Sequence, residues 1–482
     1  MRQRQRSSPE ATATLALSLL VGAVQAQAPP DPSKPWLIPD SAIERAAALD
    51  EGRIEWTQKP YDLPALIDLA QRTNPETRLA WEAARAAAAA VGLAESAYLP
   101  QLSMEALGGF EKTPLPAPKN LVPKGYFVSD SREIIPSLKL KWLLFDFGRR
   151  DAALEAAQAD SFVANAGFTA VHQQIVLEVS RTYFALGAAR GRLRAARKAL
   201  SAAQTVEDAT SAKREHGLAT VVALTQAQRQ TAQARYAVTA AEGAERNALA
   251  VLIAALGIPA ATPLEVVDET TLPLPAAPDQ SVTAAVKAAL ANRPDIIAAI
   301  GQVDSAEASL KAAERAYRPS IGFSASVFQN YGALTSDGGP TSTVDRTGET
   351  AMLSFSLPIY DGGERADHIS MARAKLGVLQ ARLALTRDGV AQQVVQAYNG
   401  LLTSLAEYHA AESLSQAANT SYDAALHAYQ QGVGTYTEVS TEENAVSEAE
   451  RQIEDARADA HTAAAALVYA MGLNRAANTP DP

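Results

Sequence analysis

Four short segments of the chain alternate apolar and polar residues. Residues 353–357 read Leu-Ser-Phe-Ser-Leu, and residues 138–142 read Leu-Lys-Leu-Lys-Trp. Successive side chains of a β-strand point to opposite faces, so this alternation is typical of a strand with one apolar face. The pattern predicts four strands, at residues 101–107, 134–145, 321–328 and 353–360, with loops at about 108–130 and 329–350.

Two long stretches of the chain contain no proline. They lie between Pro136 and Pro259 and between Pro358 and Pro480, and both are rich in Ala, Glu, Gln, Arg and Leu, which favour helices. Gly217 is the natural break in the first stretch. Each stretch is therefore predicted to form a long helical hairpin, and the helices of the first are expected at residues 151–215 and 220–256.

Proline and glycine stand where the predicted strands meet helices. A helical pattern through residues 63–98 ends just before a proline, because proline removes a backbone donor. After the second and fourth strands, glycines free the backbone to turn into the next helix. The predicted strand–helix corners are Pro100, Gly148, Pro319, Gly362 and Gly363.

The second half of the chain repeats the first. Pro75 recurs as Pro294, 219 positions later, whereas Gly217 recurs as Gly432, 215 positions later. The change in offset places a four-residue deletion in the hairpin loop of the second half, where loops tolerate changes of length. The order of helix, β-hairpin and long α-hairpin therefore occurs twice, and a tandem repeat of this kind is specific.

The first residues have the pattern of a secretory signal peptide. Arg2, Arg4 and Arg6 precede an apolar core at 11–24 and small residues suited to cleavage after residue 26 or after residue 28. This core is too short for a membrane-spanning helix, and no other apolar run approaches the ~20 residues that one needs. If the mature protein crosses a membrane, we expect it to do so with strands.

The predicted division of the chain follows from these patterns. It comprises a signal peptide (1–26), an extended N-terminal arm (27–62), a first repeat (63–260), a linker (261–280), a second repeat (281–474) and a disordered tail (475–482).

Composition and motifs exclude several kinds of function. The net charge of −10 argues against a general nucleic-acid binder, and the absence of cysteine excludes thiolate metal sites. The six histidines lack the spacing of metal ligands, and neither a phosphate-binding loop nor a nucleophile elbow is present. We therefore expect no enzyme activity, no cofactor, no metal site and no nucleic-acid partner.

Four strands in one chain impose a physical constraint. They cannot close a barrel, and an open sheet in lipid leaves the polar groups of its edges unsatisfied. Three chains would supply twelve strands, and membrane barrels begin at about eight. The predicted fold is therefore mostly α with a small membrane β-barrel. The alternative is a structural coiled-coil protein of the periplasm, without a pore, whose strands are surface hairpins.

In order and spacing, the repeated motifs resemble those of the TolC family of outer-membrane efflux and secretion channels. The resemblance covers residues 63–473 and is carried by the segments 74–76, 99–102, 145–150, 292–296, 360–365 and 431–435. It implies a homotrimer whose twelve-stranded β-barrel lies in outer-membrane lipid. This barrel would continue into an α-helical barrel that extends into the periplasm of a Gram-negative bacterium.

The resemblance also implies partners and a gate. A periplasmic adaptor (membrane fusion protein), which links such channels to an inner-membrane pump, would dock on the ends of the helical hairpins, at Gly217, Leu218, Gly432 and Val433. The periplasmic gate would use Tyr429, Glu438 and Glu442. Glu438 matches the family's first acidic position, whereas Thr441 replaces the second, with Glu442 and Glu443 beside it. The family's gating bonds therefore do not transfer intact.

The predicted function is that of a passive outer-membrane duct in a tripartite efflux or secretion system, gated at its periplasmic end. A type I duct for protein secretion is a second possibility within the same class, because the pump selects the cargo.

Overall fold

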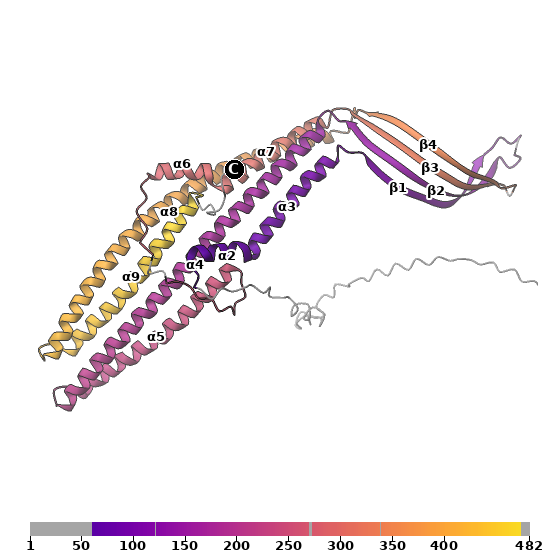
Figure 1. The fold of residues 1–482 in the computed structure, drawn as a ribbon. Coiled ribbons are helices and arrows are strands. Elements are labelled where there is room, and N and C mark those ends of the chain that lie inside the picture. Colours follow the sequence, from indigo (N-terminus) through magenta and orange to yellow (C-terminus); the bar gives the residue numbers. More distant parts are fainter. Residues whose placement is uncertain (1–59, 121, 269–271, 338, 474–482) are drawn as a thin grey trace, which may run out of the picture. The chain divides into compact units, whose positions relative to one another are not determined.

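The computed structural model describes residues 60–120, 122–268, 272–337 and 339–473 (Figure 1). The predicted signal peptide, most of the predicted N-terminal arm and the predicted tail lie outside these residues.

The described residues repeat one order of elements. The first half contains α2 (Leu63–Thr73), α3 (Pro75–Ser96), β1 (Gln101–Pro116), β2 (Tyr126–Phe145), α4 (Arg149–Glu215) and α5 (Val221–Leu256). The second half contains α6 (Val282–Asn292), α7 (Pro294–Arg315), β3 (Ser320–Ser336), β4 (Ser342–Ser356), α8 (Glu364–Gln430) and α9 (Tyr436–Ala470). The helices α4 and α8 each have 67 residues, and the predicted tandem repeat is confirmed (Figure 1).

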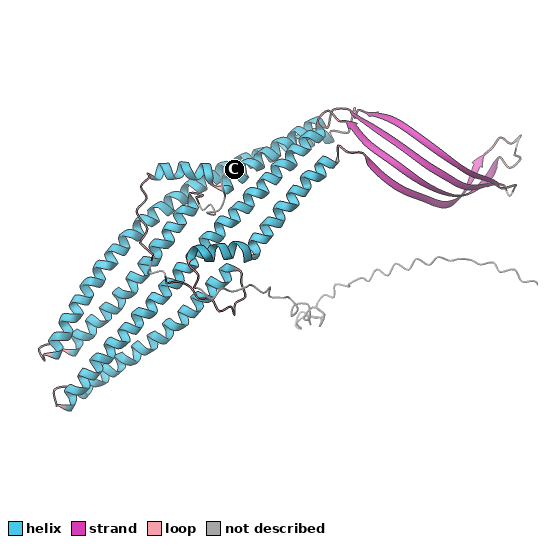
Figure 2. Ribbon diagram, in the orientation of Figure 1, coloured by secondary structure: helices cyan, strands magenta, loops and turns pink. Residues whose placement is uncertain are grey.

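The four strands form one antiparallel sheet in the order β1-β2-β3-β4 (Figure 2). Each half supplies one hairpin, and the two hairpins join through β2 and β3. The turn of the first hairpin covers residues 117–125 and that of the second covers 337–341. The second turn is therefore four residues shorter, which confirms the predicted position of the deletion.

The strands are longer than the sequence pattern predicted. We expected loops through most of residues 108–130 and 329–350, but the strands continue there as a paired ladder. These parts carry Gly, Pro and charged residues, which lower strand propensity, and the pairing with neighbouring strands overrides that preference. The prediction was also wrong at the end of β4, which stops at Ser356 rather than at residue 360. Pro358 cannot donate a hydrogen bond to the ladder.

The predicted helix 63–98 is two helices. α2 ends at Thr73 and α3 begins at Pro75, so Asn74 stands between them with an extended backbone. Its side-chain Oδ1 accepts a hydrogen bond from the backbone N–H of Glu76 at 2.9 Å and caps α3. Asparagine at the cap and proline at the first helical position together start a new helix.

The start of α3 packs against the end of α5. Gly257 has φ of 69° and ends α5, and a Cβ atom at this glycine would lie 2.6 Å from the Cα of Asn74. In the second half Gly472, with φ of 70°, approaches the backbone of Arg293 in the same way. Only glycine fits such a close approach, so each half is closed at an equivalent place.

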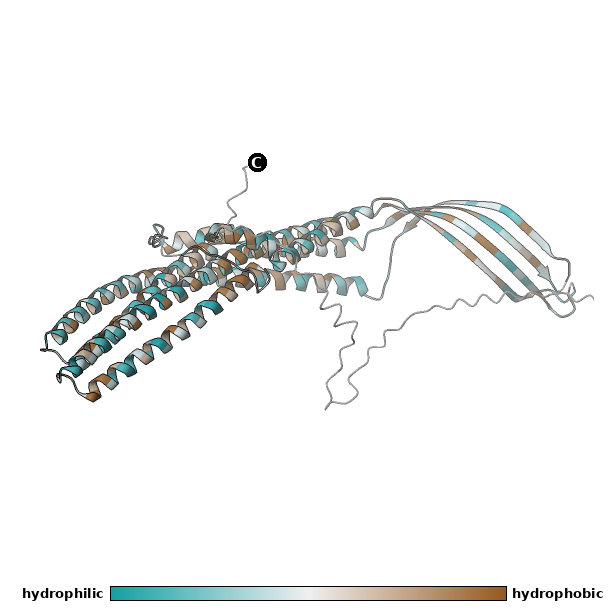
Figure 3. Cartoon of the chain, turned by 60° about the horizontal axis from the view of Figure 1, so that its bottom comes forward, coloured by the Kyte–Doolittle hydropathy of each residue, from teal (hydrophilic) through white to brown (hydrophobic). Residues whose placement is uncertain are grey.

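The long helices pack side by side. α4 contacts α3, α5, α7 and α9, and α8 contacts α6, α7 and α9. Their surfaces mix polar and apolar residues without one wide apolar stripe (Figure 3). Alanine is the commonest buried residue along α4 and α9, which lets neighbouring helices approach closely. None of the helices in the described residues is long and apolar enough to cross a membrane.

Candidate functional site

The β-sheet has one apolar face and one polar face near the helices. Strand register places Leu140 beside Leu102 on one side and beside Ala325 on the other, so the apolar residues form continuous rows. This face carries Leu102, Met104, Leu138, Leu140, Trp142, Phe323, Ala325, Val327, Ala351 and Leu353, and the one charged residue in these rows is Glu349, opposite Val327 on β4. Met104 is 80% exposed within the single chain. A contiguous apolar surface that is exposed in the single chain is typical of an interaction with protein or lipid.

In the same part of the sheet, the opposite face is polar. Register aligns Ser103 with Lys139, and Lys139 with Ser326. The ammonium of Lys139 donates to the carboxylate of Glu105 at 2.7 Å. The predicted separation of leucines and lysines on β2 is therefore present in the sheet.

The strands β1 and β4 form the two edges of the sheet. They contain 16 and 15 residues, and each pairs with only one neighbour among the described strands. A long edge offers a row of unpaired N–H and C=O groups to another strand. The sheet is therefore open to extension on both sides.

The first strand–helix corner is built around a buried ion pair. Asp146 Oδ2 accepts the backbone N–H of Arg150 at 2.9 Å, and the Nε of Arg150 lies 3.3 Å from the same oxygen. The guanidinium carbon of Arg150 lies 4.6 Å from the centroid of the Tyr98 ring. The same guanidinium donates to the carbonyl of Leu143 at 2.7 Å. One arginine thus joins the end of β2, the start of α4 and the segment before β1.

The second corner repeats this arrangement. Arg365 pairs with Asp361, and its guanidinium carbon lies 4.4 Å from the centroid of the Tyr317 ring. It also donates to the carbonyl of Pro358 at 3.1 Å. Asp361 accepts the backbone N–H of Gly363 at 3.2 Å, which positions the first turn of α8.

All five predicted corner residues lie between a strand and a helix. Pro100 and Pro319 precede β1 and β3, and Gly148 and Gly363 are the N-caps of α4 and α8. The tyrosine, aspartate and arginine that interact at each corner were not among the predicted site residues. The signal was a repeated spacing, with tyrosine two positions before each proline and arginine four positions after each aspartate: Tyr98, Asp146 and Arg150 in the first half, and Tyr317, Asp361 and Arg365 in the second.

Each long helical hairpin ends in a tight turn that exposes one apolar side chain. Gly217 has φ of 72°, and the N–H of Leu218 donates to the carbonyl of Lys213 at 2.8 Å. Gly432 has φ of 81°, and the N–H of Val433 donates to the carbonyl of Ala428 at 3.0 Å. Glycine in the left-handed conformation ends both helices in this way.

The side chains after the two turn glycines are largely exposed to solvent. Leu218 is 77% exposed and Val433 is 84% exposed. Both are among the four residues predicted to contact an adaptor, together with Gly217 and Gly432, and that role stays a prediction.

Tyr429, predicted as a gate residue, links the two halves of the chain. Its hydroxyl lies 2.9 Å from the Oγ1 of Thr210 on α4. The ammonium of Lys213 lies 3.8 Å from the centroid of the tyrosine ring and donates to the backbone carbonyl of Tyr429. The ring is buried and packs with Val206 and Val439.

The predicted acidic gate residues do not join this cluster. The carboxylate of Glu438 accepts the backbone N–H of Thr435 at 2.8 Å, and the Oγ1 of Thr435 accepts the N–H of Glu438 at 3.3 Å. This reciprocal capping box starts α9. Glu442 is half-buried on the next turn. Tyr429, Glu438 and Glu442 therefore do not form one bonded group in the described part of the chain.

Glu443, next to the predicted gate residue Glu442, is the unusual carboxylate of this region. It is 5% exposed, and no hydrogen bond or ion pair reaches its carboxylate from the described residues. Burial raises its pKa to about 7, because a low-dielectric environment disfavours the charged form. The sequence alone indicated only that Glu443 stands beside the predicted gate position, since burial depends on which helix lies opposite.

Ion pairs join α4 to α9 beyond the hairpin ends. Each pair links a cation on α4 with a carboxylate on α9: Arg192 with Asp455 at 2.6 Å, Arg194 with Glu454 at 3.3 Å, and Lys198 with Glu450 at 2.6 Å. Pairs that are partly exposed to water contribute about 0–1 kcal/mol each, so their main effect is to align the two helices.

Comparisons with known proteins agree with this architecture. The family model described as outer membrane efflux protein matches residues 66–258 and 285–473, and each matched segment contains two helices, a β-hairpin and a long α-hairpin in that order. Protein CyaE of Bordetella pertussis is 29% identical over 348 residues, which cover 71% of this chain and 70% of CyaE. Outer membrane protein OprJ of Pseudomonas aeruginosa is 24% identical over 410 residues, which cover 82% of this chain and 81% of OprJ.

Solved structures share the fold. A crystal structure of CusC superposes with a TM-score of 0.72 over 85% of this chain and 92% of the CusC chain, at 21% identity. The similarity at this level of identity concerns the fold.

Proposed function

The chain belongs to the outer membrane efflux protein family, and we propose that three copies of it form a passive duct from the periplasm to the cell exterior. The protein is an outer-membrane efflux channel of a Gram-negative bacterium and not an enzyme.

The open edges of the sheet carry this proposal. If β4 of one chain pairs with β1 of the next, three chains close a barrel of twelve strands and leave no edge in lipid. Closure also turns the apolar rows of the sheet outward. The polar row with Lys139 and Glu105 then lines a water-filled interior.

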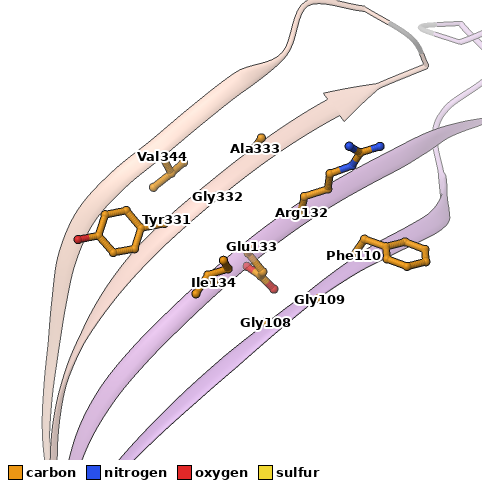
Figure 4. A pocket seen from close by; sticks show the side chains of 10 residues that line it. All are labelled: Gly108, Gly109, Phe110, Arg132, Glu133, Ile134, Tyr331, Gly332, Ala333 and Val344. Atoms are coloured by element: carbon orange, nitrogen blue, oxygen red, sulfur yellow. The ribbon is translucent and has the colours of Figure 1, made fainter. Parts of the chain in front are cut away.

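The length of the apolar band supports a position within the membrane. Leu102 and Phe110 lie on one face of β1, eight residues apart, which is about 26 Å at about 3.3 Å per residue. The apolar band of an outer-membrane barrel is about 25 Å tall and is flanked by aromatic residues. Phe110 and Tyr331 lie toward the hairpin turns (Figure 4), and Trp142 lies at the end near the helices.

The helical hairpins provide the periplasmic part of the duct. Helices of 67 residues are about 100 Å long at about 1.5 Å per residue. Their mixed surfaces suit a wall one helix thick, with water on both sides (Figure 3). An adaptor that joins the duct to an inner-membrane pump would contact Leu218 and Val433 at the exposed ends. A pump for small molecules and an exporter for type I protein secretion would both use this geometry.

Gating would separate the two hairpins at these ends. The bonds from Tyr429 to Thr210 and Lys213 hold the hairpins together, and we propose that they break when the duct opens. Three copies of Glu438 and Glu442 would add negative charge at the same end, which concentrates cations.

Single-channel conductance of the purified protein in a planar bilayer tests the proposal. We expect small, cation-selective events from a protein whose mass in solution corresponds to three chains. Glu438→Ala should reduce cation selectivity if the carboxylate faces the duct. Thr435→Ala is the matched control, because it breaks the same capping box and keeps the charge.

A monomer without conductance would overturn the proposed duct. An equal loss of selectivity in Thr435→Ala and Glu438→Ala would assign the effect to the helix cap and remove Glu438 from the gate.

A further inference from the structure

A hollow of about 410 Å³ lies among α4, α5 and α9. Small side chains form its floor and one wall: Ala195, Ala196 and Ala199 on α4, and Ala234, Ala237 and Ala241 on α5. Polar side chains form the other boundaries: Gln230 and Gln233 on α5, and Glu443, Asn444 and Ser447 on α9. Ligand sites commonly have volumes of about 300–1,000 Å³ and mostly apolar walls with a few polar groups.

The hollow lies on the concave side of the helix layer. α4 packs between α5 and α9, and yet the side-chain amide of Gln230 on α5 donates to Asn444 Oδ1 on α9 at 2.9 Å. Axes of packed helices are about 8–10 Å apart, so two helices that flank a third meet only if the layer curves toward that side. In the proposed duct, a concave side of the wall faces the interior.

The charges around the hollow cancel except at Glu443. Arg192 pairs with Asp455 at 2.6 Å. Arg451 pairs with Glu448 at 2.5 Å and with Asp455 at 2.7 Å. Two guanidinium groups and two carboxylates therefore neutralise each other. Glu443, which is 5% exposed, keeps a carboxylate without a bonded partner in the described structure.

The groups on the other sides of Glu443 do not supply a cation. A smaller hollow of about 120 Å³ lies on the α8 side of Glu443, and Lys198 also lines it. The ammonium of this lysine is already paired with Glu450 at 2.6 Å. The remaining titratable groups that face or act on this region are Tyr422 and Asp423 on α8, Tyr436 on α9 and Arg229 on α5. Asp423 adds a second negative charge, and Arg229 interacts electrostatically with Tyr436.

We propose that the hollow binds a small organic cation, whose ammonium group pairs with Glu443 and whose apolar body lies on the alanine floor. The side-chain oxygens of Gln230 and Gln233 are placed to accept further N–H groups. A divalent metal ion fits less well, because it needs several oxygen ligands. No group of three or more acidic or histidine side chains in the described residues could hold one.

The ionisation of Glu443 makes binding sensitive to pH. An ammonium ligand stabilises the carboxylate and not the carboxylic acid, so it competes with the proton. Because burial raises the pKa of Glu443 to about 7, the affinity should fall as the pH drops below 7.

The place of the site inside a duct rests on the proposed function, whereas the binding itself does not. If the duct exists, cationic cargo passes this carboxylate near the periplasmic end. Lack of conductance with retained binding would overturn the duct alone. Conductance without binding would overturn the cation site alone.

Binding to the purified full-length protein tests the site directly. The probe is 2-phenylethylamine, which is charged at pH 8, and 2-phenylethanol is its neutral counterpart. Calorimetric titration should show that Glu443→Gln weakens binding of the amine at least tenfold and leaves binding of the alcohol unchanged. Glu442→Gln, which removes the neighbouring charge, should bind the amine like the wild type.

A second variant fills the hollow without touching the carboxylate. Ala237 is exposed on α5, so Ala237→Leu is compatible with folding and should abolish binding of both probes. If Glu443→Gln does not fold, Ala237→Leu alone tests whether the probes bind in the hollow. The proposal is overturned if Glu443→Gln or Ala237→Leu keeps the wild-type affinity for the amine, or if Glu442→Gln loses as much as Glu443→Gln.

Discussion

At the scale of single residues, two neighbouring glutamates differ because of the helix that each one faces. Glu442 is half-buried, whereas Glu443 points toward the alanines of α4 and is buried. A buried carboxylate without a partner is costly when it is charged. Glu443 is therefore both the proposed cation ligand and a source of instability in the empty protein.

The stability of the protein should depend on pH through Glu443. Its pKa is about 7 in the folded chain and 4.5 without burial, so the unfolded chain loses this proton first as the pH rises. The unfavourable contribution therefore grows from about pH 4.5 and is complete above about pH 7. Glu443→Gln should melt roughly 2–4 °C higher than the wild type at pH 8. At pH 4.5 the two should melt together.

The same melting comparison with Glu442→Gln is the control. A gain at pH 8 of equal size in that variant, or a gain for Glu443→Gln that does not change with pH, would contradict the assignment of the raised pKa to Glu443.

At the scale of elements, the strand–helix corners depend on glycine conformations that other residues avoid. Gly148 and Gly363 occupy equivalent N-caps with φ of 89° and 99°. Their surroundings differ. A Cβ atom at Gly148 would lie 2.9 Å from the guanidinium of Arg315, which donates to the Gly148 carbonyl at 2.6 Å, whereas the space around Gly363 is open.

Alanine substitutions at the two corners should therefore differ in effect. Both Gly148→Ala and Gly363→Ala incur the left-handed backbone strain of about 1–2 kcal/mol. Only Gly148→Ala also displaces Arg315 and weakens a hydrogen bond, which adds about 1 kcal/mol. Thermal unfolding should show the larger loss for Gly148→Ala. Equal losses would mean that Arg315 moves aside without cost.

At the scale of the whole molecule, the repeat places two similar hairpins side by side and joins them at their ends. Tyr429 of the second half meets Thr210 of the first half in a buried contact. Ion pairs between α4 and α9 continue the connection toward the sheet. Separation of the hairpins at their ends would therefore break the contacts of Tyr429. Separation along their whole length would also break the ion pairs between α4 and α9.

Covalent linkage of this contact should block transport. The chain contains no cysteine, so two cysteines introduced at Thr210 and Tyr429 are the only thiols that can react with a short cross-linker carrying two thiol-reactive groups. We expect cross-linked cells to lose most of their efflux, measured as accumulation of a fluorescent substrate. The two single-cysteine variants, treated in the same way, are the controls. Unchanged efflux in the cross-linked double variant would exclude gating by separation of these hairpins.

Much of the architecture follows from local features of the sequence. Proline and glycine act through their own backbone chemistry, so Pro100, Gly148 and Gly217 mark corners and turns wherever the chain folds. The long stretches without proline likewise predict α4 and α8, because nothing within them interrupts the helical hydrogen bonds. The shift of offset from 219 to 215 places the shorter turn without any knowledge of the sheet.

The tertiary structure decided what depends on partners distant in the chain. The strands extend beyond their alternating segments because neighbouring strands satisfy their backbone groups. Glu438 caps its own helix, whereas Glu443 is buried because α4 lies opposite. Arg150 reaches Tyr98 across 52 positions of sequence. Local backbone preference can be read from the order of residues, but burial and charge pairing arise only when separate elements meet.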